Sequence, residues 1–143
     1  MSTLPHSSLV VLSSPAPILY TSTTVTFPVP SGVAVDDDGN LFVADLAAAA
    51  ILQMDSTGSE SEVMVQEYES KPFVGPTDVV FDGRRNMFFT DSGPFGETTL
   101  SSPRGSLFAV VESPDGGQVL KPIALESLAH PAGLCLSPDG ACM

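Results

Sequence analysis

The chain has few positive charges, few cysteines and no long apolar run. Its 143 residues include 5 Lys and Arg against 17 Asp and Glu, a formal net charge of −12, and no positive residue precedes Lys71. Nucleic-acid binding is not expected, because no basic surface is available to meet a phosphate backbone. A secretory signal needs a basic start and a membrane helix needs about 20 apolar residues, so neither is expected. The expected location is the cytoplasm.

The two cysteines indicate neither a metal site nor a disulfide framework. Cys135 and Cys142 are separated by six residues, which is not a metal-ligand spacing. The strand register expected for this segment places them on opposite faces of a sheet, where a disulfide cannot form. The 13 prolines and 12 glycines predict closely spaced turns rather than long helices.

A sequence unit recurs along the chain. Residues 30–45 (PSGVAVDDDGNLFVAD) align without a gap with residues 76–91 (PTDVVFDGRRNMFFTD), and a third copy begins at Pro131. The copies start 46 and 55 residues apart. A four-stranded propeller blade takes roughly 40–50 residues. The spacing therefore predicts stacked propeller blades.

We divide the chain by these repeats. Residues 30–75 form a first blade unit, residues 76–130 a second, and residues 131–143 the truncated start of a third. Residues 1–29 are either the outer strands of a preceding blade or a loose leader rich in Ser, Thr and Pro.

Each full copy has the pattern of a β-hairpin. Two apolar runs flank a polar turn in each of them, and the runs do not alternate, so both sheet faces should be buried. Two outer strands should follow each hairpin, with a tight passage at 47–50 leading into the first of them. The expected strands are 33–35, 41–43, 51–54, 63–65, 79–81, 87–89, 106–111 and 118–120. The fold class is all-β, a propeller fragment of about two to three four-stranded antiparallel blades.

The last residue falls inside a repeat. Met143 aligns with Phe42 and Phe88, in the middle of the second strand of their units. We therefore expect a partial propeller whose open blade edges favour self-association.

The repeated motifs resemble those of known six-bladed propellers. The pattern that starts at Pro30 and Pro76 resembles NHL-type propellers. Residues 76–82 (PTDVVFD), followed by 88–93 (FFTDSG), look more like the senescence marker protein/gluconolactonase/luciferin-regenerating-enzyme family. Residues 130–140 (HPAGLCLSPDG) resemble a stretch that this family shares with the strictosidine-synthase-like group.

The resemblance implies a chemistry that this stretch matches only in part. Gluconolactonase-like members hold a divalent cation such as calcium in the central channel, and it polarises a lactone or ester carbonyl or activates water. Among its ligands are Asn or Asp side chains that correspond to Ser31, Thr77 and Ala132 here, none of which is a carboxylate or an amide. Strictosidine-synthase-like members often need no metal, and their catalytic glutamate belongs to a later blade.

Five residues are candidates for contact with a small-molecule substrate. Asp78 replaces the glycine of the other copies, and Thr77 and Ser31 occupy family ligand positions, so Asp78 and Thr77 are also weak metal candidates. Glu97 and Phe95 lie on the insertion that makes the second unit longer than the first. Insertions on rigid scaffolds often carry function.

Other acidic residues have simpler interpretations. Asp45 and Asp91 end the second strand of their units, where a carboxylate is expected to bind backbone N–H groups and tie blades together. The run Asp36–Asp38 lacks the spacing of a calcium loop and is expected to be a solvated turn.

Three functions remain open from the sequence. The first is a lactone- or ester-hydrolysing enzyme of the gluconolactonase type, with Asp78, Thr77 and Glu97 near its pocket. The second is a non-catalytic, NHL-type binding propeller. The third is a truncated product without independent activity.

Overall fold

The computed structural model describes residues 29–140 and 142–143, and in this part of the chain every regular element is a β-strand. No helix there is long and apolar enough to cross a membrane. The interpretation of the first 29 residues falls almost entirely on residues 1–28, outside the described part. The strands are β1 Pro30–Val35, β2 Leu41–Asp45, β3 Ala50–Met54, β4 Ser61–Val65, β5 Glu67–Tyr68, β6 Lys71–Pro72, β7 Pro76–Phe81, β8 Met87–Asp91, β9 Gly105–Glu112 and β10 Gln118–Leu128.

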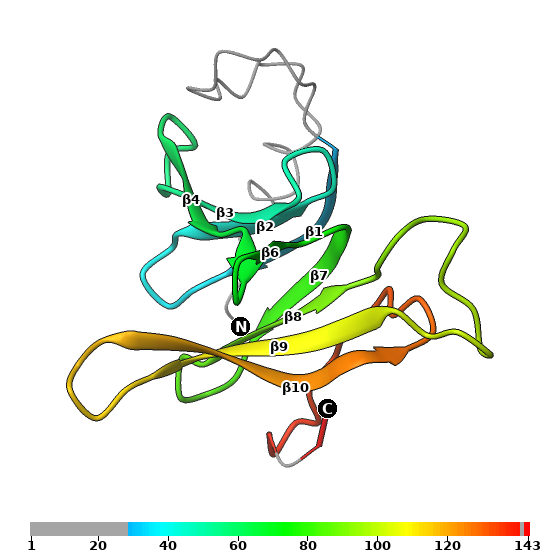
Figure 1. Cartoon of the computed structure of the whole chain (residues 1–143). Coiled ribbons are helices and arrows are strands. Elements are labelled where there is room, and N and C mark those ends of the chain that lie inside the picture. Colours follow the sequence, from blue (N-terminus) through cyan, green and yellow to red (C-terminus); the bar gives the residue numbers. More distant parts are fainter. Residues whose placement is uncertain (1–28, 141) are drawn as a thin grey trace.

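Two four-stranded antiparallel sheets are stacked one on the other (Figure 1). The first has the order β1-β2-β3-β4, and the second runs from β7 to β10 in chain order. Each sheet is a meander, so every strand pairs with its neighbour in sequence, and the longest connection within a sheet is residues 92–104 between β8 and β9. The fold is a β-propeller fragment, as the repeat predicts.

The two predicted hairpins are confirmed. Val33 pairs with Val43 in the first sheet, and Val79 pairs with Phe89 in the second. Both hairpins carry a register shift at the same place, just after their first proline. The shared irregularity shows that the sequence repeat is also a structural repeat.

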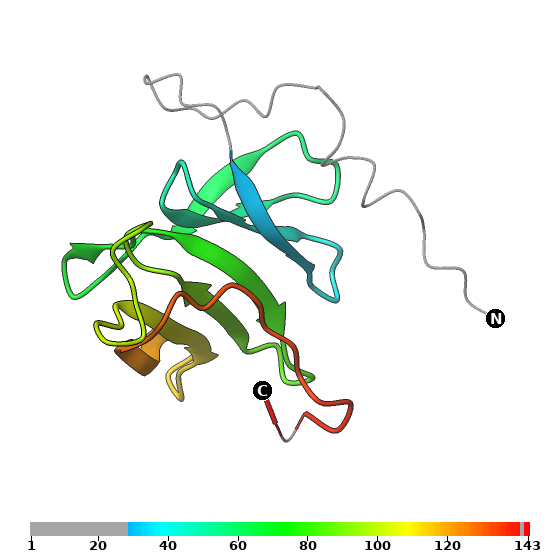
Figure 2. The same ribbon diagram turned by 90° about the vertical axis from the view of Figure 1, so that its right-hand side faces the viewer.

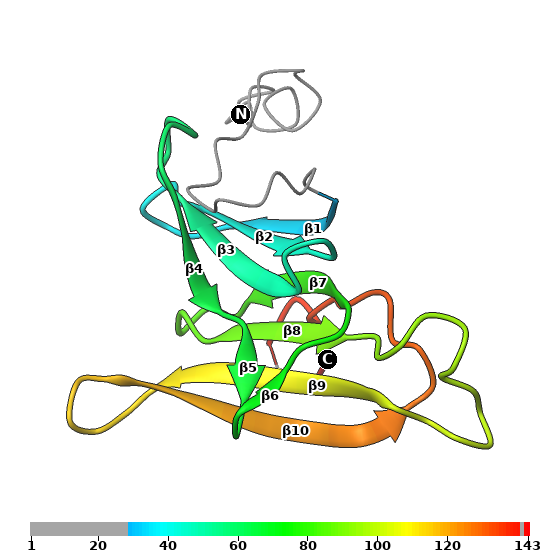
Figure 3. The ribbon, with the colours of Figure 1, turned by 45° about the horizontal axis from the view of Figure 1, so that its top comes forward.

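The core lies between the sheets and is rich in phenylalanine. Phe89 is fully buried, stacks on Phe108 with ring centroids 5.3 Å apart, and meets Phe73 edge-on at 5.2 Å. Phe73 comes from the segment that links the two sheets, directly after the small hairpin of β5 and β6 (Figure 3). This hairpin turns at Glu69 and Ser70, both with positive φ, and nothing in the sequence predicts it.

The expected burial of both sheet faces holds for β2 but is wrong for β1. All five residues of β2 are buried, whereas Val33 and Val35 of β1 are 41% and 48% exposed. Side chains alternate along a strand, and Ala34 is the β1 residue that packs against the core between the sheets. Val33 and Val35 therefore point to the opposite face, which the second sheet does not cover.

The third repeat copy forms no strand among the described residues. A hairpin strand is held by its partner, and the residue equivalent to the first position of β2 is Cys142. The segment instead runs beside β7 (Figure 2), where the Leu134 amide donates to Asp78 Oδ2 at 2.7 Å. Cys135 and Cys142 are free thiols, as predicted.

Candidate functional site at the starts of the first strands

The candidate residues gather where β1, β7 and the third repeat copy begin. Ser31 Oγ lies 2.8 Å from the Thr77 carbonyl oxygen and 3.1 Å from that of Pro76. A Cβ atom on Gly32 would lie 2.7 Å from Asp78 Cα, so only glycine lets the two strands approach this closely. The structure thus brings Ser31, Thr77 and Asp78 together.

Thr77 is the centre of a small group of hydroxyls. Its Oγ1 lies 3.0 Å from Thr90 Oγ1, 2.8 Å from Ser92 Oγ and 2.9 Å from the Pro131 carbonyl oxygen. Ser92 Oγ donates to the same carbonyl at 2.6 Å. Thr90 and Ser92 are buried at 1% and 2% exposure, so these contacts lie away from solvent.

Asp78 has both carboxylate oxygens engaged by backbone amides. Oδ1 accepts from its neighbour Val79 at 2.9 Å, and Oδ2 accepts from Leu134 of the third copy at 2.7 Å. The carboxylate is therefore held in one orientation between two repeat units.

Asp45 and Asp91 bind the chain that leads into their own units. Asp91 accepts from the amides of Gly75 at 2.7 Å and Val74 at 3.1 Å, while Asp45 accepts from Val29 at 3.1 Å. Both side chains are buried. These bonds fix the path by which the chain approaches each first strand.

The insertion places Glu97 and Phe95 apart from these residues. Glu97 Oε2 pairs with Arg104 Nη1 at 3.3 Å. The Phe95 ring is 92% exposed and meets the His130 ring edge-on at 5.9 Å. In the described part of the chain, their side-chain contacts go to Arg104 and His130 rather than to Asp78 or Thr77.

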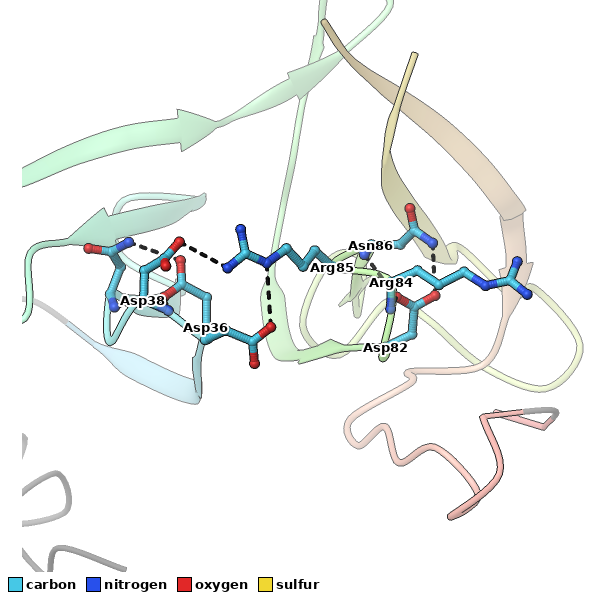
Figure 4. Close-up of polar contacts among 8 residues, drawn as sticks. Asp36, Asp38, Asp82, Arg84, Arg85 and Asn86 are labelled. Atoms are coloured by element: carbon cyan, nitrogen blue, oxygen red, sulfur yellow. Dashed lines mark hydrogen bonds and ion pairs between the residues drawn. The ribbon is translucent and has the colours of Figure 1, made fainter. Parts of the chain in front are cut away.

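The hairpin turns at the other ends of β1 and β7 hold a second group of carboxylates (Figure 4). Asp82 Oδ1 accepts from the amides of Arg84 at 2.8 Å and Asn86 at 2.9 Å, and its Oδ2 accepts from the Asn86 side chain. Burial raises the pKa of Asp82, but these hydrogen bonds outweigh it and hold that pKa below its usual value. Asp36 makes the equivalent contacts, with the same effect on its pKa.

Arg85 connects the two turns. Its guanidinium lies 3.4 Å from Asp37 Oδ2 and 3.1 Å from Asp38 Oδ2, although all three side chains are largely exposed (Figure 4). The acidic run is therefore a partner for Arg85, which the sequence does not predict because the residues lie 47 and 48 positions apart.

The remaining geometry offers no ready metal centre. Among the described residues, no three His, Cys, Asp or Glu side chains lie close enough together to hold a metal ion. A hollow of about 600 Å³ opens beside Asp55 and Glu60, and none of Ser31, Thr77 and Asp78 lines it.

Two residues that contact Thr77 are absent from the sequence-based candidates. Thr90 and Ser92 complete the hydroxyl group around Thr77. The repeat alignment contains a signal for them, because the equivalent residues of the first unit are Ala44 and Leu46. Ala44 and Thr90 are both buried, whereas Leu46 is 38% exposed and Ser92 is buried, so these two positions differ between the units.

Comparison with known proteins identifies the architecture. No protein-family model matches the sequence. The chain is 34% identical over 119 residues to a gluconolactonase of Zymomonas mobilis, covering 78% of this chain and 32% of the relative. A gluconolactonase structure from Xanthomonas campestris superposes with a TM-score of 0.61 at 30% identity, covering 80% of this chain and 38% of that one. These residues form part of a gluconolactonase-like β-propeller.

The likeness extends to a second group and is limited in length. The strictosidine synthase-like protein 3 of Arabidopsis thaliana is 28% identical over 121 residues, covering 78% of this chain and 30% of the relative. The chain thus spans about a third of the length of these two relatives. Ser31, Thr77 and Asp78 lie at the starts of β1 and β7, each of which is an edge strand of its sheet.

Proposed function

We propose that this part of the propeller belongs to a hydrolase that opens a lactone or cleaves an ester. The observation that supports the proposal is the 34% identity to a gluconolactonase over 119 residues. The expected substrate is a small molecule that enters at the starts of β1 and β7.

Asp78 is the residue that we propose to meet the substrate or its attacking water. Amides of Val79 and Leu134 hold the two carboxylate oxygens at 2.9 and 2.7 Å. Each carboxylate oxygen has a further lone pair, so Asp78 can still accept a hydrogen bond from a substrate hydroxyl or a water molecule. Its fixed orientation lowers the entropic cost of that contact.

The family resemblance implies a divalent cation, and the side chains at the matching positions do not fit one. Calcium and magnesium take several carboxylate, amide or carbonyl oxygens, whereas Ser31 and Thr77 supply neutral hydroxyls and Ala132 supplies a methyl group. No step of the proposed hydrolysis is assigned to a cation held by these residues.

A non-catalytic binding propeller is the second candidate. It is favoured by the hydroxyls of Ser31 and Ser92, which donate to backbone carbonyls rather than into an open site. A binding propeller would retain a small molecule or a partner without turnover.

Lactone hydrolysis by the purified chain separates these candidates. A hydrolase predicts acid release from five- and six-membered lactones above the spontaneous rate, followed with a pH indicator. Asp78→Asn should lower that rate, and Asp37→Asn, a matched change at the distant hairpin turn, should leave it unchanged. Circular dichroism would establish that each protein is folded. A folded chain that shows no turnover with either ring size would contradict the hydrolase.

A further inference from the structure

The positions that correspond to family cation ligands make hydrogen bonds from one repeat unit to the next. In the first unit, the Ser31 hydroxyl has three carbonyl oxygens within reach, and the closest is that of Thr77 in the second unit, at 2.8 Å. The others belong to Pro76 at 3.1 Å and Ala44 at 3.4 Å. A hydroxyl carries a single proton, so the shortest contact indicates a bond that crosses from β1 to the start of β7.

In the second unit, three hydroxyls form a series of hydrogen bonds that ends on a carbonyl of the third copy. Because each has one proton, one arrangement satisfies the contacts in sequence: Thr90 donates to Thr77, Thr77 to Ser92, and Ser92 to the Pro131 carbonyl. The amide of Asp78 donates to Thr90 Oγ1 at 3.2 Å and starts the series. We call Thr77, Thr90 and Ser92 the hydroxyl relay. It ends on the first residue of the third copy.

Asp78 also makes a hydrogen bond to the next unit, but here the second unit supplies the acceptor and the third copy the donor. Its Oδ2 accepts from the Leu134 amide of the third copy, and its Oδ1 accepts from Val79. Each amide donates to one of the two carboxylate oxygens, and the bond from Leu134 ties the carboxylate to the third copy. The nearest carboxylate to the ligand positions is therefore already used for a contact between units.

From these contacts we infer that Ser31 and the hydroxyl relay latch successive units together, and that these positions bind no divalent cation. In place of a shared ion, two hydrogen bonds cross between units, from Ser31 to the Thr77 carbonyl and from Ser92, the last hydroxyl of the relay, to the Pro131 carbonyl. The inference concerns the joining of units and applies whether the propeller is a hydrolase or a binding module.

Thermal unfolding of the chain in calcium and in EDTA tests the inference. The wild-type midpoint should be the same in both, because nothing at these positions gains from the ion. Thr77→Val keeps the shape of the side chain and removes the relay's central hydroxyl. It should lower the midpoint by about 4 °C, equally in calcium and in EDTA.

Two further variants serve as controls. Thr77→Ser keeps a hydroxyl and should restore most of the lost midpoint. Thr99→Val is the same chemical change on the exposed insertion, where the midpoint should move little.

A wild-type midpoint that rises in calcium, together with loss of that rise in Thr77→Val, would overturn the inference. So would a Thr77→Val midpoint equal to that of the wild type. If Thr77→Val does not fold, the wild-type comparison and Thr77→Ser still decide.

Discussion

Asp91 illustrates how a single buried charge is accommodated between two segments. Its side chain is 8% exposed and accepts from three backbone amides, those of Val74, Gly75 and Gly93. An unpaired carboxylate at this depth would be costly, whereas amide donors repay its desolvation. Asp91 therefore stabilises the fold through the hydrogen bonds that its two carboxylate oxygens accept.

Asp91→Asn should destabilise the protein although the side chain keeps its size. An amide group has one acceptor oxygen and an NH₂ group, and the NH₂ group would face the donors of Val74 or Gly75. We expect a loss of about 1–3 kcal/mol in the free energy of unfolding, measured by urea denaturation. Glu62→Gln, the same kind of change on an exposed strand position, should cost much less. Equal stabilities of the two variants would contradict this role of Asp91.

The lowered pKa of Asp55 predicts how the stability of the protein depends on pH. Hydrogen bonds from the Thr57 hydroxyl and the Glu60 amide lower the pKa of its carboxyl from 3.8 to about 2. A lowered pKa in the folded state adds stability above pH 3.8, which is lost as the pH falls from 3.8 towards 2. NMR titration of the wild type should find this low value.

In Thr57→Val the largest cause of that shift is removed, so the pKa of Asp55 should rise towards 3.8. The pKa of Asp82, lowered by its own turn, should not change. An unchanged Asp55 pKa in the variant would exclude Thr57 as the cause.

At the scale of elements, aromatic rings pack the core both within the second sheet and between the two sheets. Phe89 of β8 and Phe108 of β9 stack, and Phe73 from the linking segment closes over them. A further ring pair, Phe42 with Phe81, joins β2 to β7 at 4.8 Å between centroids. Aromatic pairs add stability beyond the area they bury.

Phe89→Ala should therefore be strongly destabilising. A fully buried phenylalanine that is truncated leaves a cavity and costs about 3–5 kcal/mol. Phe95→Ala is the matched control, because this ring is 92% exposed and its loss should change stability little. Denaturant unfolding measures both, and Phe89→Leu provides a smaller cavity if the alanine variant does not fold. Similar losses for Phe89→Ala and Phe95→Ala would contradict the placement of the core.

The sequence predicts elements well where the determinants are local. The hairpins at 33–43 and 79–89 follow from apolar runs around a turn, and β3 and β9 lie where expected. The β5–β6 hairpin is missed because it turns at Glu69 and Ser70, residues with no turn preference as strong as glycine's.

The candidate site is predicted only in part, for a different reason. Repeat alignment singles out Ser31 and Thr77 because they occupy matching positions, and Asp78 because it replaces the glycine of the other copies. The relay depends on contacts such as Ser92 with Pro131, 39 residues apart. Alignment of equivalent positions does not reveal which residues of different units contact each other. For the same reason, the apolar run of β1 does not reveal that Val33 is exposed.

At the scale of the whole molecule, the sheet edges differ in how well they are protected. The outer strand β10 carries Lys121 and Pro122 and two register shifts, all of which discourage pairing with another chain. Strand β1 is also an edge of its sheet, contains no charged residue and exposes Val33 and Val35. We therefore propose that a second copy of this chain associates through β1.

Val35→Lys tests this association. A charge on the exposed face of β1 opposes pairing with another apolar strand, so the variant should remain monomeric at concentrations where the wild type forms oligomers. Sedimentation velocity over a range of concentrations measures the difference. Val119→Lys, a comparable change on β10 at a valine that is 38% exposed, should associate as the wild type does. A wild type that is monomeric throughout would contradict self-association, and equal oligomer formation by Val35→Lys and the wild type would exclude β1 as the contact.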